Sequence, residues 1–364
     1  MRKLASIEVI DNLEPIPNAD RILKATVKGW ECVVSKADNF SIGDKVIYIE
    51  VDSVLPPKPE FSFMKDRKYR VKTIKLKKQI SQGLILPMSY LKGSFKVGDD
   101  VTKILGITKY DPQQDAENKL IEHTKSNNPL NYMVKYLYRF EWFRKLYSKF
   151  VVKNCSFPTH IAKKTDVERI QNLSNIFKDW QNRRVPFYVT EKLDGCSATF
   201  FLNDNKFGVC SRNIWLRKED NSCYWEVARR FQLEESLKAL SKAFNFKRVV
   251  IQGEIIGNSI QGNKYKISGY DFYVFNIILD GMKLEQCKAK EVCKQFNLKV
   301  VPVLYSGYTL PTTIQELVEL SKGKSKVNTN TEREGLVIRN YDENISFKVI
   351  NPNFLLKNDE WLKE

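Results

Sequence analysis

The sequence changes character near residue 106, and that change limits more than any other feature what the chain can fold into. Before it, short alternating runs of β-forming residues are separated by turns rich in Pro, Gly, Asn and Asp. The runs predicted to form strands are Ser6–Ile10, Ile22–Val27, Trp30–Val34, Lys45–Val51, Tyr69–Leu76 and Gly83–Leu86. Several short strands within about a hundred residues are typical of a small closed barrel. Residues 1–106 are therefore predicted to form an N-terminal β-barrel domain.

From residue 151 onward the pattern alternates between helices and strands. The predicted helices are Thr165–Trp180, which begins with a capping signature, Trp225–Phe231 and Leu233–Phe244. The predicted strands are Phe187–Thr190, Ala198–Leu202, Val249–Ile256, Phe272–Leu279, Gly335–Arg339 and Ser346–Val349. Helices among mainly antiparallel strands indicate an α+β domain over residues 151–364.

Residues 107–150 join the two predicted domains. Asp111–Asn128 is polar, whereas Leu130–Phe150 places aromatic residues at steps of three or four and interleaves them with Lys and Arg. This pattern predicts a polar connector followed by a basic amphipathic helix. A helix that packs on one domain and leaves its basic face in water is favoured over a helix dedicated to gripping RNA.

The charge of the chain favours a polyanionic partner. The 60 Lys and Arg residues exceed the 43 Asp and Glu residues, which gives a formal net charge of +17 and a pI near 9.4. Such a charge attracts nucleic acid, and the OB-fold is the small barrel that binds nucleic acid. The N-terminal barrel is therefore predicted to be of the OB type. The charge alone is weak evidence, because ribosomal and membrane-surface proteins share it.

Several classes of protein are disfavoured by what the sequence lacks. No apolar run approaches the roughly 18–20 residues that span a bilayer, and acidic residues soon interrupt the apolar N-terminal stretch. We therefore expect no signal peptide, no membrane partner, and a cytoplasmic or nuclear location. Seven cysteines without a Cys-x-x-Cys pair argue against a disulfide framework and a zinc site. With only two histidines, any chemistry must fall to Lys, Arg, Glu and Asp.

One lysine stands where a predicted strand breaks into a turn. Lys192 precedes Asp194 and Gly195 by two and three positions, and Gly195 would let the backbone turn sharply so that the lysine projects into a pocket. An amine is nucleophilic only when neutral, and burial or neighbouring positive charge lowers its pKa. The tetrapeptide alone is a weak signal, and an exposed turn lysine is the plainer interpretation of it.

Further motifs follow this lysine in a fixed order. They are Ser211-Arg212-Asn213, Gln252-Gly253-Glu254-Ile255-Ile256-Gly257, Asp271-Phe272-Tyr273-Val274-Phe275-Asn276, Arg333-Glu334-Gly335-Leu336-Val337-Ile338-Arg339 and Ser346-Phe347-Lys348. Their order and spacing resemble the covalent nucleotidyltransferase superfamily, which includes polynucleotide ligases and mRNA capping enzymes. The segment from Gly253 to Ile277 is similar to RNA ligases of the phage RNA ligase 2 type.

The N-terminal half narrows the resemblance. The segments that carry it are Leu13–Ile22, Gly29–Val34, Ile80–Leu84 and Thr165–Asn172, and they resemble RNA ligases of the Naegleria/Deinococcus type. That family implies an N-terminal OB module followed by a nucleotidyltransferase domain with ATP-grasp-like antiparallel sheets and helices. DNA ligases and capping enzymes carry their OB domain after the last motif, so the resemblance disfavours both.

The resemblance implies a reaction in three steps. Lys192 would attack the α-phosphorus of ATP and release pyrophosphate. The resulting lysyl-AMP would pass AMP to an RNA 5′-phosphate, and an RNA 3′-OH would then displace AMP. The implied partner is RNA with a nicked duplex or broken strand ends, which suggests RNA repair, and no obligate protein partner is inferred.

The resemblance also implies roles for individual residues. Lys348 would hold the α-phosphate, Glu254 the ribose, and Phe275 the adenine ring by stacking. Glu191 would lie near the adenine edge, and Arg212 would contact the ribose or the RNA end. The residues implied as Mg²⁺ or Mn²⁺ ligands, with oxygen donors that suit such ions, are Asp194, Glu254 and Glu334.

Each role has a plainer alternative. Phe275 in an apolar strand would ordinarily be part of the core, and the charged residues could be solvated. The sequence also departs from the family, because Ile350 stands where a second lysine is common, so Lys357 would substitute or one lysine would suffice. Asn276 stands where Asp is common.

Two rival functions stay open at this point. A capping-type guanylyltransferase would use the same lysine with GTP. A non-catalytic, OB-containing RNA-binding protein would keep the basic surface without the chemistry.

Overall fold

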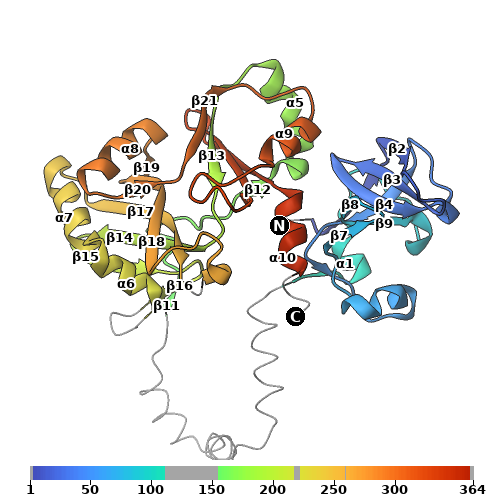
Figure 1. Cartoon of the computed structure of the whole chain (residues 1–364), viewed down its shortest axis with the longest axis horizontal. Coiled ribbons are helices and arrows are strands. Elements are labelled where there is room, and N and C mark those ends of the chain that lie inside the picture. The colour runs from blue at the N-terminus through green and yellow to red at the C-terminus, as the bar shows by residue number, and fades with distance from the viewer. Residues whose placement is uncertain (1–2, 111–154, 217–221, 259, 361–364) are drawn as a thin grey trace, which may run out of the picture. The chain divides into compact units, whose positions relative to one another are not determined.

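The computed structural model describes residues 3–110, 155–216, 222–258 and 260–360. The chain divides into two compact units, residues 1–146 with 355–364 and residues 147–354, and Figure 1 shows the elements of each. The predicted polar connector and basic helix at 111–150 lie outside the described residues, as does the side chain of Lys357.

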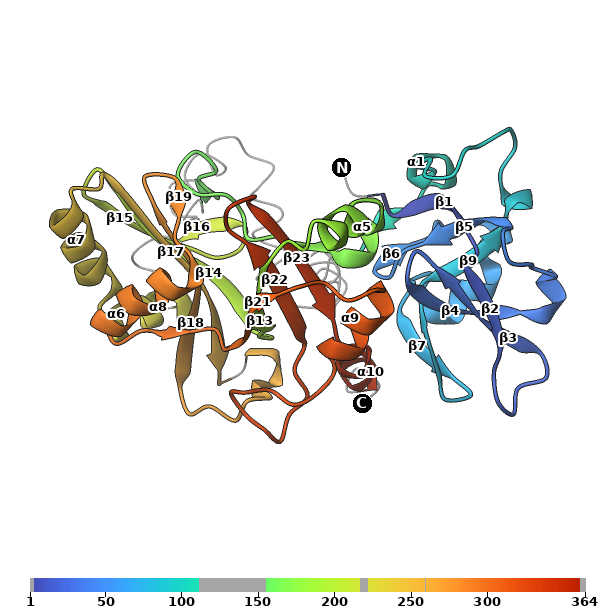
Figure 2. The same ribbon diagram turned by 90° about the horizontal axis from the view of Figure 1, so that it is seen from above.

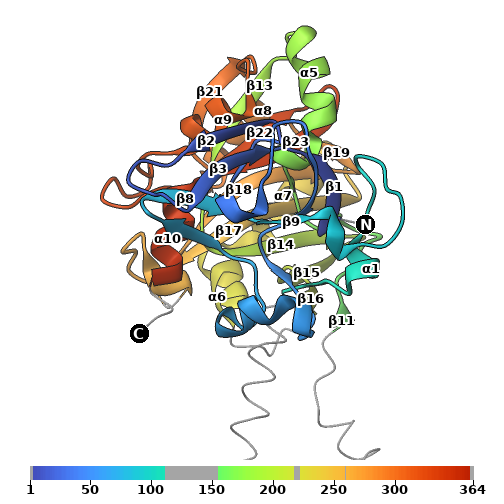
Figure 3. The ribbon, with the colours of Figure 1, turned by 90° about the vertical axis from the view of Figure 1, so that its right-hand side faces the viewer.

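The first unit consists of short antiparallel strands. Its strands are β1 (Ala5–Val9), β2 (Asn12–Pro15), β3 (Ile22–Val27), β4 (Trp30–Ser35), β5 (Lys45–Ile49), β6 (Ser53–Val54), β7 (Thr73–Leu76), β8 (Gln79–Gln82), β9 (Leu84–Pro87) and β10 (Thr108–Lys109). They pair in the orders β1-β5-β9, β2-β3-β4, β7-β8 and β10-β6. Figures 2 and 3 show most of these strands from two further sides. Its helical segments are the 3₁₀ turns Lys36–Asp38, Pro59–Arg67 and Met88–Tyr90 and the helix α1 (Thr102–Leu105).

Apolar side chains of these strands alternate into the interior of the unit. In β4 every second residue from Trp30 is buried, because successive side chains of a strand point to opposite faces. The rings of Trp30 and Tyr48 stack with centroids 6.1 Å apart. The largest departure from the predicted strand bounds is at β7, which begins at Thr73 and not at Tyr69, a residue with a positive φ. The strands β2, β8 and β10 were not predicted, and β10 pairs with β6 beyond residue 106.

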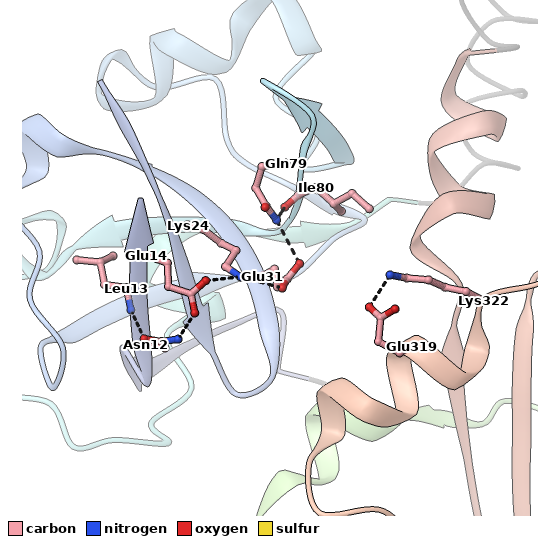
Figure 4. A network of polar contacts seen from close by, with 9 residues as sticks. All are labelled: Asn12, Leu13, Glu14, Lys24, Glu31, Gln79, Ile80, Glu319 and Lys322. Atoms are coloured by element: carbon pink, nitrogen blue, oxygen red, sulfur yellow. Dashed lines mark hydrogen bonds and ion pairs between the residues drawn. The ribbon is translucent and has the colours of Figure 1, made fainter. Parts of the chain in front are cut away.

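A polar network covers the surface of the β2-β3-β4 sheet (Figure 4). Lys24 Nζ lies 2.7 Å from Glu14 Oε2 and 3.5 Å from Glu31 Oε1. The amides of Asn12 and Gln79 donate hydrogen bonds to the same two carboxylates, at 2.6 and 3.2 Å. Each charge of this network therefore has a partner within the first unit.

The second unit contains two sheets. The larger one follows the order β11-β16-β15-β14-β17-β18-β19, with β20 paired to β18. Its strands are β11 (Cys155–Ser156), β14 (Cys196–Asn203), β15 (Lys206–Cys210), β16 (Ile214–Leu216), β17 (Arg248–Gly257), β18 (Tyr270–Leu279), β19 (Met282–Lys283) and β20 (Lys299–Val300). Helices α6 (Cys223–Arg230), α7 (Leu233–Phe244) and α8 (Gln286–Gln295) pack on this sheet and share one apolar core with it.

The smaller sheet follows the order β12-β23-β22-β13-β21. Its strands are β12 (Glu168–Arg169), β13 (Phe187–Lys192), β21 (Val303–Tyr308), β22 (Gly335–Asn340) and β23 (Ile345–Ile350). Helices α5 (Ser174–Asn182) and α9 (Ile314–Ser321) enclose its core, which contains Phe187, Phe347 and Trp180. The helix α10 (Pro352–Glu360) follows β23, and a 3₁₀ turn at Ile260–Asn263 follows β17.

The predicted helix from Thr165 is wrong over its first half, up to Leu173. Residues Glu168 and Arg169 form β12, which pairs in parallel with β23 opposite Phe347 and Lys348. A 3₁₀ turn follows, and the α-helix begins only at Ser174. The capping signature misled because tertiary strand pairing outweighs local helix preference. None of the helices in the described part of the chain has the length and apolar character needed to cross a bilayer.

Candidate active site

Lys192 is the last residue of β13, a strand that lies between β22 and β21. It stands opposite Gly335 on β22, so Glu334, the residue before Gly335, comes within reach. Lys192 Nζ donates a 2.6 Å hydrogen bond to Glu334 Oε2, and the two side chains are 25% and 16% exposed. The lysine is thus held in a half-buried ion pair and is not an exposed turn residue.

The turn after Lys192 carries the chain from the smaller sheet to the larger one. Its glycine, Gly195, sits so close to β17 that an added Cβ would lie 2.2 Å from the carbonyl oxygen of Ile255. The φ angle of Gly195 is outside the left-handed region. The chain bends at Gly195, and the glycine is required there for close backbone approach and not for a left-handed φ.

Glu254 reaches the same place from β17 of the larger sheet. Its Oε1 accepts a 3.1 Å hydrogen bond from the backbone N–H of Gly195. Its charge acts on Lys192, and the charges of Glu334 and Asp194 act on Glu254. The two sheets therefore bring Lys192, Glu254, Glu334 and Asp194 together.

Asp194 is fixed by two residues that the sequence motifs did not single out. Its carboxylate pairs with Lys264, and its backbone N–H donates a 2.8 Å hydrogen bond to the hydroxyl of Tyr265. Tyr265 is 3% exposed, and burial raises the pKa of its hydroxyl. Lys264 and Tyr265 belong to a loop without a recognisable motif, so only the tertiary structure reveals them.

Burial and crowding perturb the acids of this cluster. Burial raises the pKa of Glu254 to about 8, since the neighbouring Lys192 offsets only part of the cost of a buried negative charge. Burial likewise raises the pKa of Glu334, although Lys192 opposes the shift. Three carboxyl groups share a partly desolvated space, so their negative charge favours a cationic ligand.

The amine of Lys192 is under two opposing influences. Burial lowers its pKa, but the charges of Glu334 and Glu254 raise it more, so the net shift is upward. In the ligand-free protein the amine is therefore protonated. The expectation that burial and positive neighbours keep it neutral does not hold in this state, because its nearest neighbours are acids.

Lys348 lies on β23, where it is half-buried and stands opposite Val337 on β22. Its positive charge acts on Glu334 and lowers the pKa of that carboxyl, which places the two groups close together. Ile350, two residues further along β23, is buried at 7% exposure opposite Gly335. The position where a second lysine is common thus belongs to the packed interior.

Glu191 points away from Lys192, as successive residues of a strand must. It is 1% exposed, and its Oε2 accepts a 2.7 Å hydrogen bond from the backbone N–H of Lys326. Its Oε1 is buried and has no hydrogen-bond partner among the described residues. Burial raises the pKa of this carboxyl. An orphaned buried oxygen suits a ligand that donates a hydrogen bond.

Phe275 is half-buried on β18 and packs against an apolar cluster that includes Leu193, Tyr265 and Tyr273. The guanidinium of Arg339, which ends the Glu334–Arg339 motif, lies 5.9 Å from the centre of its ring. The neighbouring Asn276 is buried and donates a 2.9 Å hydrogen bond to Gln252 Oε1. Phe275 thus lies beside the turn that follows Lys192 and keeps part of its surface open.

Arg212 does not join the cluster in this structure. It lies after β15, is about half exposed, and pairs with the carboxylate of Asp166. Both side chains are exposed, at 54% and 59%. Its implied contact with ribose or RNA stays a prediction.

The carboxylates supply the hard oxygen donors that Mg²⁺ and Mn²⁺ prefer. Within the described ranges, however, no three His, Cys, Asp or Glu side chains form a ready metal-ligand group. Two of the acids already form ion pairs: Asp194 with Lys264, and Glu334 with Lys192. The donor set fits a divalent ion held by one or two carboxylates together with water and phosphate oxygens, which is the usual manner of binding for Mg²⁺.

Comparison with known proteins agrees with this geometry. Residues 185–350 match the model of the RNA ligase family, and residues 4–88 match an OB-fold domain model. No curated protein matches the chain at a significant level. The predicted α+β class with an N-terminal OB-fold is confirmed by these models and by the solved structures that the chain resembles.

Three solved structures of Naegleria gruberi RNA ligase illustrate the likeness. A mutant without ligand has 34% identity and a TM-score of 0.78, with 99% of both chains covered. A mutant with ATP and Mn has 34% identity and a TM-score of 0.77, with 97% of this chain and 98% of the other covered. A mutant with AMP and Mn has 34% identity and a TM-score of 0.78 over the same shares. With this identity along nearly its whole length, the chain belongs to the RNA ligase family.

Proposed function

We propose that the protein is an ATP-dependent RNA ligase that carries AMP on Lys192 and joins RNA 3′-OH and 5′-phosphate ends. The observation that carries this proposal is the half-buried Lys192–Glu334 pair beside Glu254 and Asp194. A structural ion pair gains little from two further acids nearby, because each adds repulsion and desolvation cost. A site that must bind a metal-bound triphosphate, by contrast, uses these additional acids.

In the first step, Lys192 Nζ forms a bond to the α-phosphorus of ATP as the bond to pyrophosphate breaks. The amine must lose a proton beforehand, since only the neutral form is nucleophilic. Glu334 Oε2, at 2.6 Å from Nζ, is placed to accept it. Lys348, on β23 at the far side of β22 from Lys192, contributes positive charge where negative charge develops on the phosphate.

A divalent ion supplies charge neutralisation and polarisation of the phosphate when it is bound. Asp194, Glu254 and Glu334 are the residues that would hold it, directly or through water. Two of the related structures contain Mn together with ATP or AMP. Neutralisation of the acids would also remove the influence that keeps the pKa of Lys192 high.

In the second step, a 5′-phosphate oxygen of RNA attacks the phosphorus of the lysyl-AMP, and the amine of Lys192 leaves. In the third step, an RNA 3′-OH attacks the activated 5′-phosphate, and AMP leaves. The same cationic group, Lys348, can serve all three displacements because each develops charge on the same kind of phosphate.

The nucleoside portion of ATP would lie between the two sheets of the second unit. The orphaned Oε1 of Glu191 can accept a hydrogen bond from the exocyclic amine of adenine. The half-exposed ring of Phe275 can stack on the base, and Glu254 can accept from the ribose hydroxyls. Guanine offers a carbonyl oxygen where adenine has its amine, so Glu191 favours ATP over GTP.

Mass spectrometry of the full chain after incubation with ATP and Mn²⁺ tests the proposal. The expected result is one added AMP, located on the peptide that contains Lys192, and the same treatment with GTP should add nothing. A 5′-phosphorylated RNA then removes the AMP from the protein. Label from GTP alone, or AMP on another residue, would sink the proposal. We further propose that the enzyme works in RNA repair, in the cytoplasm or nucleus, on a nicked duplex or broken strand ends.

A further inference from the structure

A basic groove of about 520 Å³ opens on the surface of the second unit. Its walls carry three cationic side chains from three separate parts of the chain: Arg230 at the end of α6, Lys266 in the loop after β17, and Lys299 on β20. All three residues are exposed. The groove is thus accessible to a ligand of extended shape.

The loop after β17 connects this groove to the active site. Lys264 and Tyr265 hold Asp194 through its carboxylate and its backbone N–H. The next residue, Lys266, lines the groove. Three consecutive residues therefore contact either the catalytic cluster or the groove, so a ligand in the groove would bind the same loop that holds Asp194.

The loop is held in one shape without any ligand. The side chain of Asn263 both donates to the carbonyl and accepts from the N–H of Ile267, at 2.9 and 3.0 Å. Asn328 and Thr331 donate to the carbonyls of Tyr265 and Lys264, at 3.0 and 3.2 Å. Preorganised loops of this kind bind without the cost of ordering.

The chemistry of the groove suits a nucleic-acid backbone. Asp271 is the carboxylate of the lining, and it pairs with Lys299, so two positive charges are in excess. The rings of Phe231 and Tyr270 lie among the cations, with the Arg230 guanidinium 5.6 Å from the Phe231 ring centre. Cationic side chains interleaved with aromatic rings are typical of grooves that bind RNA strands through phosphates and stacked bases.

We propose that this groove binds the backbone phosphates of the RNA strand close to the end that is being joined. The inference rests on the proposed function, because the active site supplies the reason for RNA to arrive there. Lys266 is the residue with the most direct role, since it is exposed and adjoins the residues that hold Asp194.

The test compares three full-length variants: Lys266→Gln, the double variant Arg230→Gln/Lys266→Gln, and the control Lys242→Gln, which removes an exposed charge on α7 outside the groove. Fluorescence anisotropy with a labelled, 5′-phosphorylated nicked RNA duplex gives the affinity across a salt series. AMP capture from ATP and Mn²⁺ without RNA is measured in parallel.

The double variant should bind the RNA roughly tenfold more weakly, and its slope of log affinity against log salt should fall by about 0.7–0.9 for each phosphate that the protein no longer neutralises. Lys266→Gln should show about half of the change in slope, and the control should match the wild type. AMP capture without RNA should keep its wild-type rate, because that step precedes RNA binding.

The possible failures can be told apart. An unchanged RNA affinity and salt slope in the double variant would overturn the proposal that the groove binds RNA, but would not affect the proposed chemistry of Lys192. Parallel loss of AMP capture and RNA binding would show that the loop is merely structural, which also overturns it. Absence of AMP on the wild-type protein would instead overturn the proposed function, while the binding data would still decide the groove.

Discussion

Both units contain a lysine placed among glutamates, yet the two arrangements differ in what burial does to the acids. In the first unit, the hydrogen bond from Lys24 lowers the pKa of Glu14 (Figure 4). In the second unit, burial raises the pKa of Glu254 to about 8, although Lys192 opposes the shift. The first arrangement satisfies its own charges, whereas in the second burial and crowding disfavour the charged forms of the acids in spite of the lysine.

The difference separates a surface ion pair from the pair that we propose to be catalytic. The carboxylates near Lys24 also receive hydrogen bonds from Asn12 and Gln79, so the network is complete without a ligand. Around Lys192 the acids come from two sheets and repel one another. Such crowding costs stability and is retained where it serves binding or chemistry. Strongly perturbed acids, more than the presence of an ion pair, mark the functional site.

The largest difference between substitutions of the two lysines is expected in AMP capture. Lys192→Ala removes the atom that bonds to phosphorus, so the covalent adduct should fall below detection, while RNA binding should persist. Lys24→Ala, the matched control in the other unit, should capture AMP at the wild-type level. Intact-mass spectrometry after ATP and Mn²⁺ measures both. An adduct of equal yield on Lys192→Ala would show that the nucleophile lies elsewhere.

A second contrast concerns the acidic partners. Glu334→Gln keeps the shape of the side chain but removes the charge and the proton acceptor 2.6 Å from the amine. The rate of AMP capture should fall by about 10²–10³-fold, the usual loss for a removed electrostatic contact in an active site. Glu14→Gln, the corresponding change in the first unit, should leave the rate unchanged. Quench-flow measurement of labelled AMP on the protein compares the two.

The raised pKa of Glu254 predicts a dependence of stability on pH. Because the folded protein binds this proton up to pH about 8 and the unfolded chain releases it near the ordinary value of 4.5, stability is lost as pH rises through that window. Glu254→Gln cannot titrate, so its Tm relative to wild type should rise by a few degrees between pH 5 and pH 8. Calorimetry of both proteins at several pH values checks this, and a constant difference would contradict it.

The smallest effect belongs to the surface network. Lys24→Ala should change the free energy of unfolding by less than about 1 kcal/mol, because a partly solvated ion pair contributes little after screening and side-chain entropy. Urea unfolding at low and high salt measures it. A loss several times larger, or one insensitive to salt, would show that Lys24 does more than a surface ion pair can.

The architecture was accessible from the sequence where the pattern was strong. Long periodic segments such as Leu233–Phe244 have the predicted bounds. The ordered motifs brought Lys192, Glu254 and Glu334 into one hypothesis, and the structure places these side chains side by side. The resemblance to the family supplied this grouping, because the strands that carry the motifs, β13, β17 and β22, pair within two sheets that meet at the turn after Lys192.

Other features depend on contacts that no local pattern encodes. The strand β12 forms only because β23 is beside it, which overrides a capping signature at Thr165. The loop with Lys264 and Tyr265 has no periodicity, and its contact with Asp194 spans about 70 residues of sequence. The protonated state of Lys192 likewise follows from acids that are distant in the sequence: Glu334 beside the paired strand β22 and Glu254 on β17 of the larger sheet.

The two ends of the Lys192–Glu334 pair are 142 residues apart in the chain. Contacts of such separation require the closure of a long loop and form late when a chain folds. A growing polypeptide therefore carries Lys192, the proposed nucleophile, long before it acquires Glu334, the proposed proton acceptor. During refolding, covalent labelling by nucleotide should return later than the helical circular-dichroism signal. The time course of labelling would therefore report when the native sheet is complete.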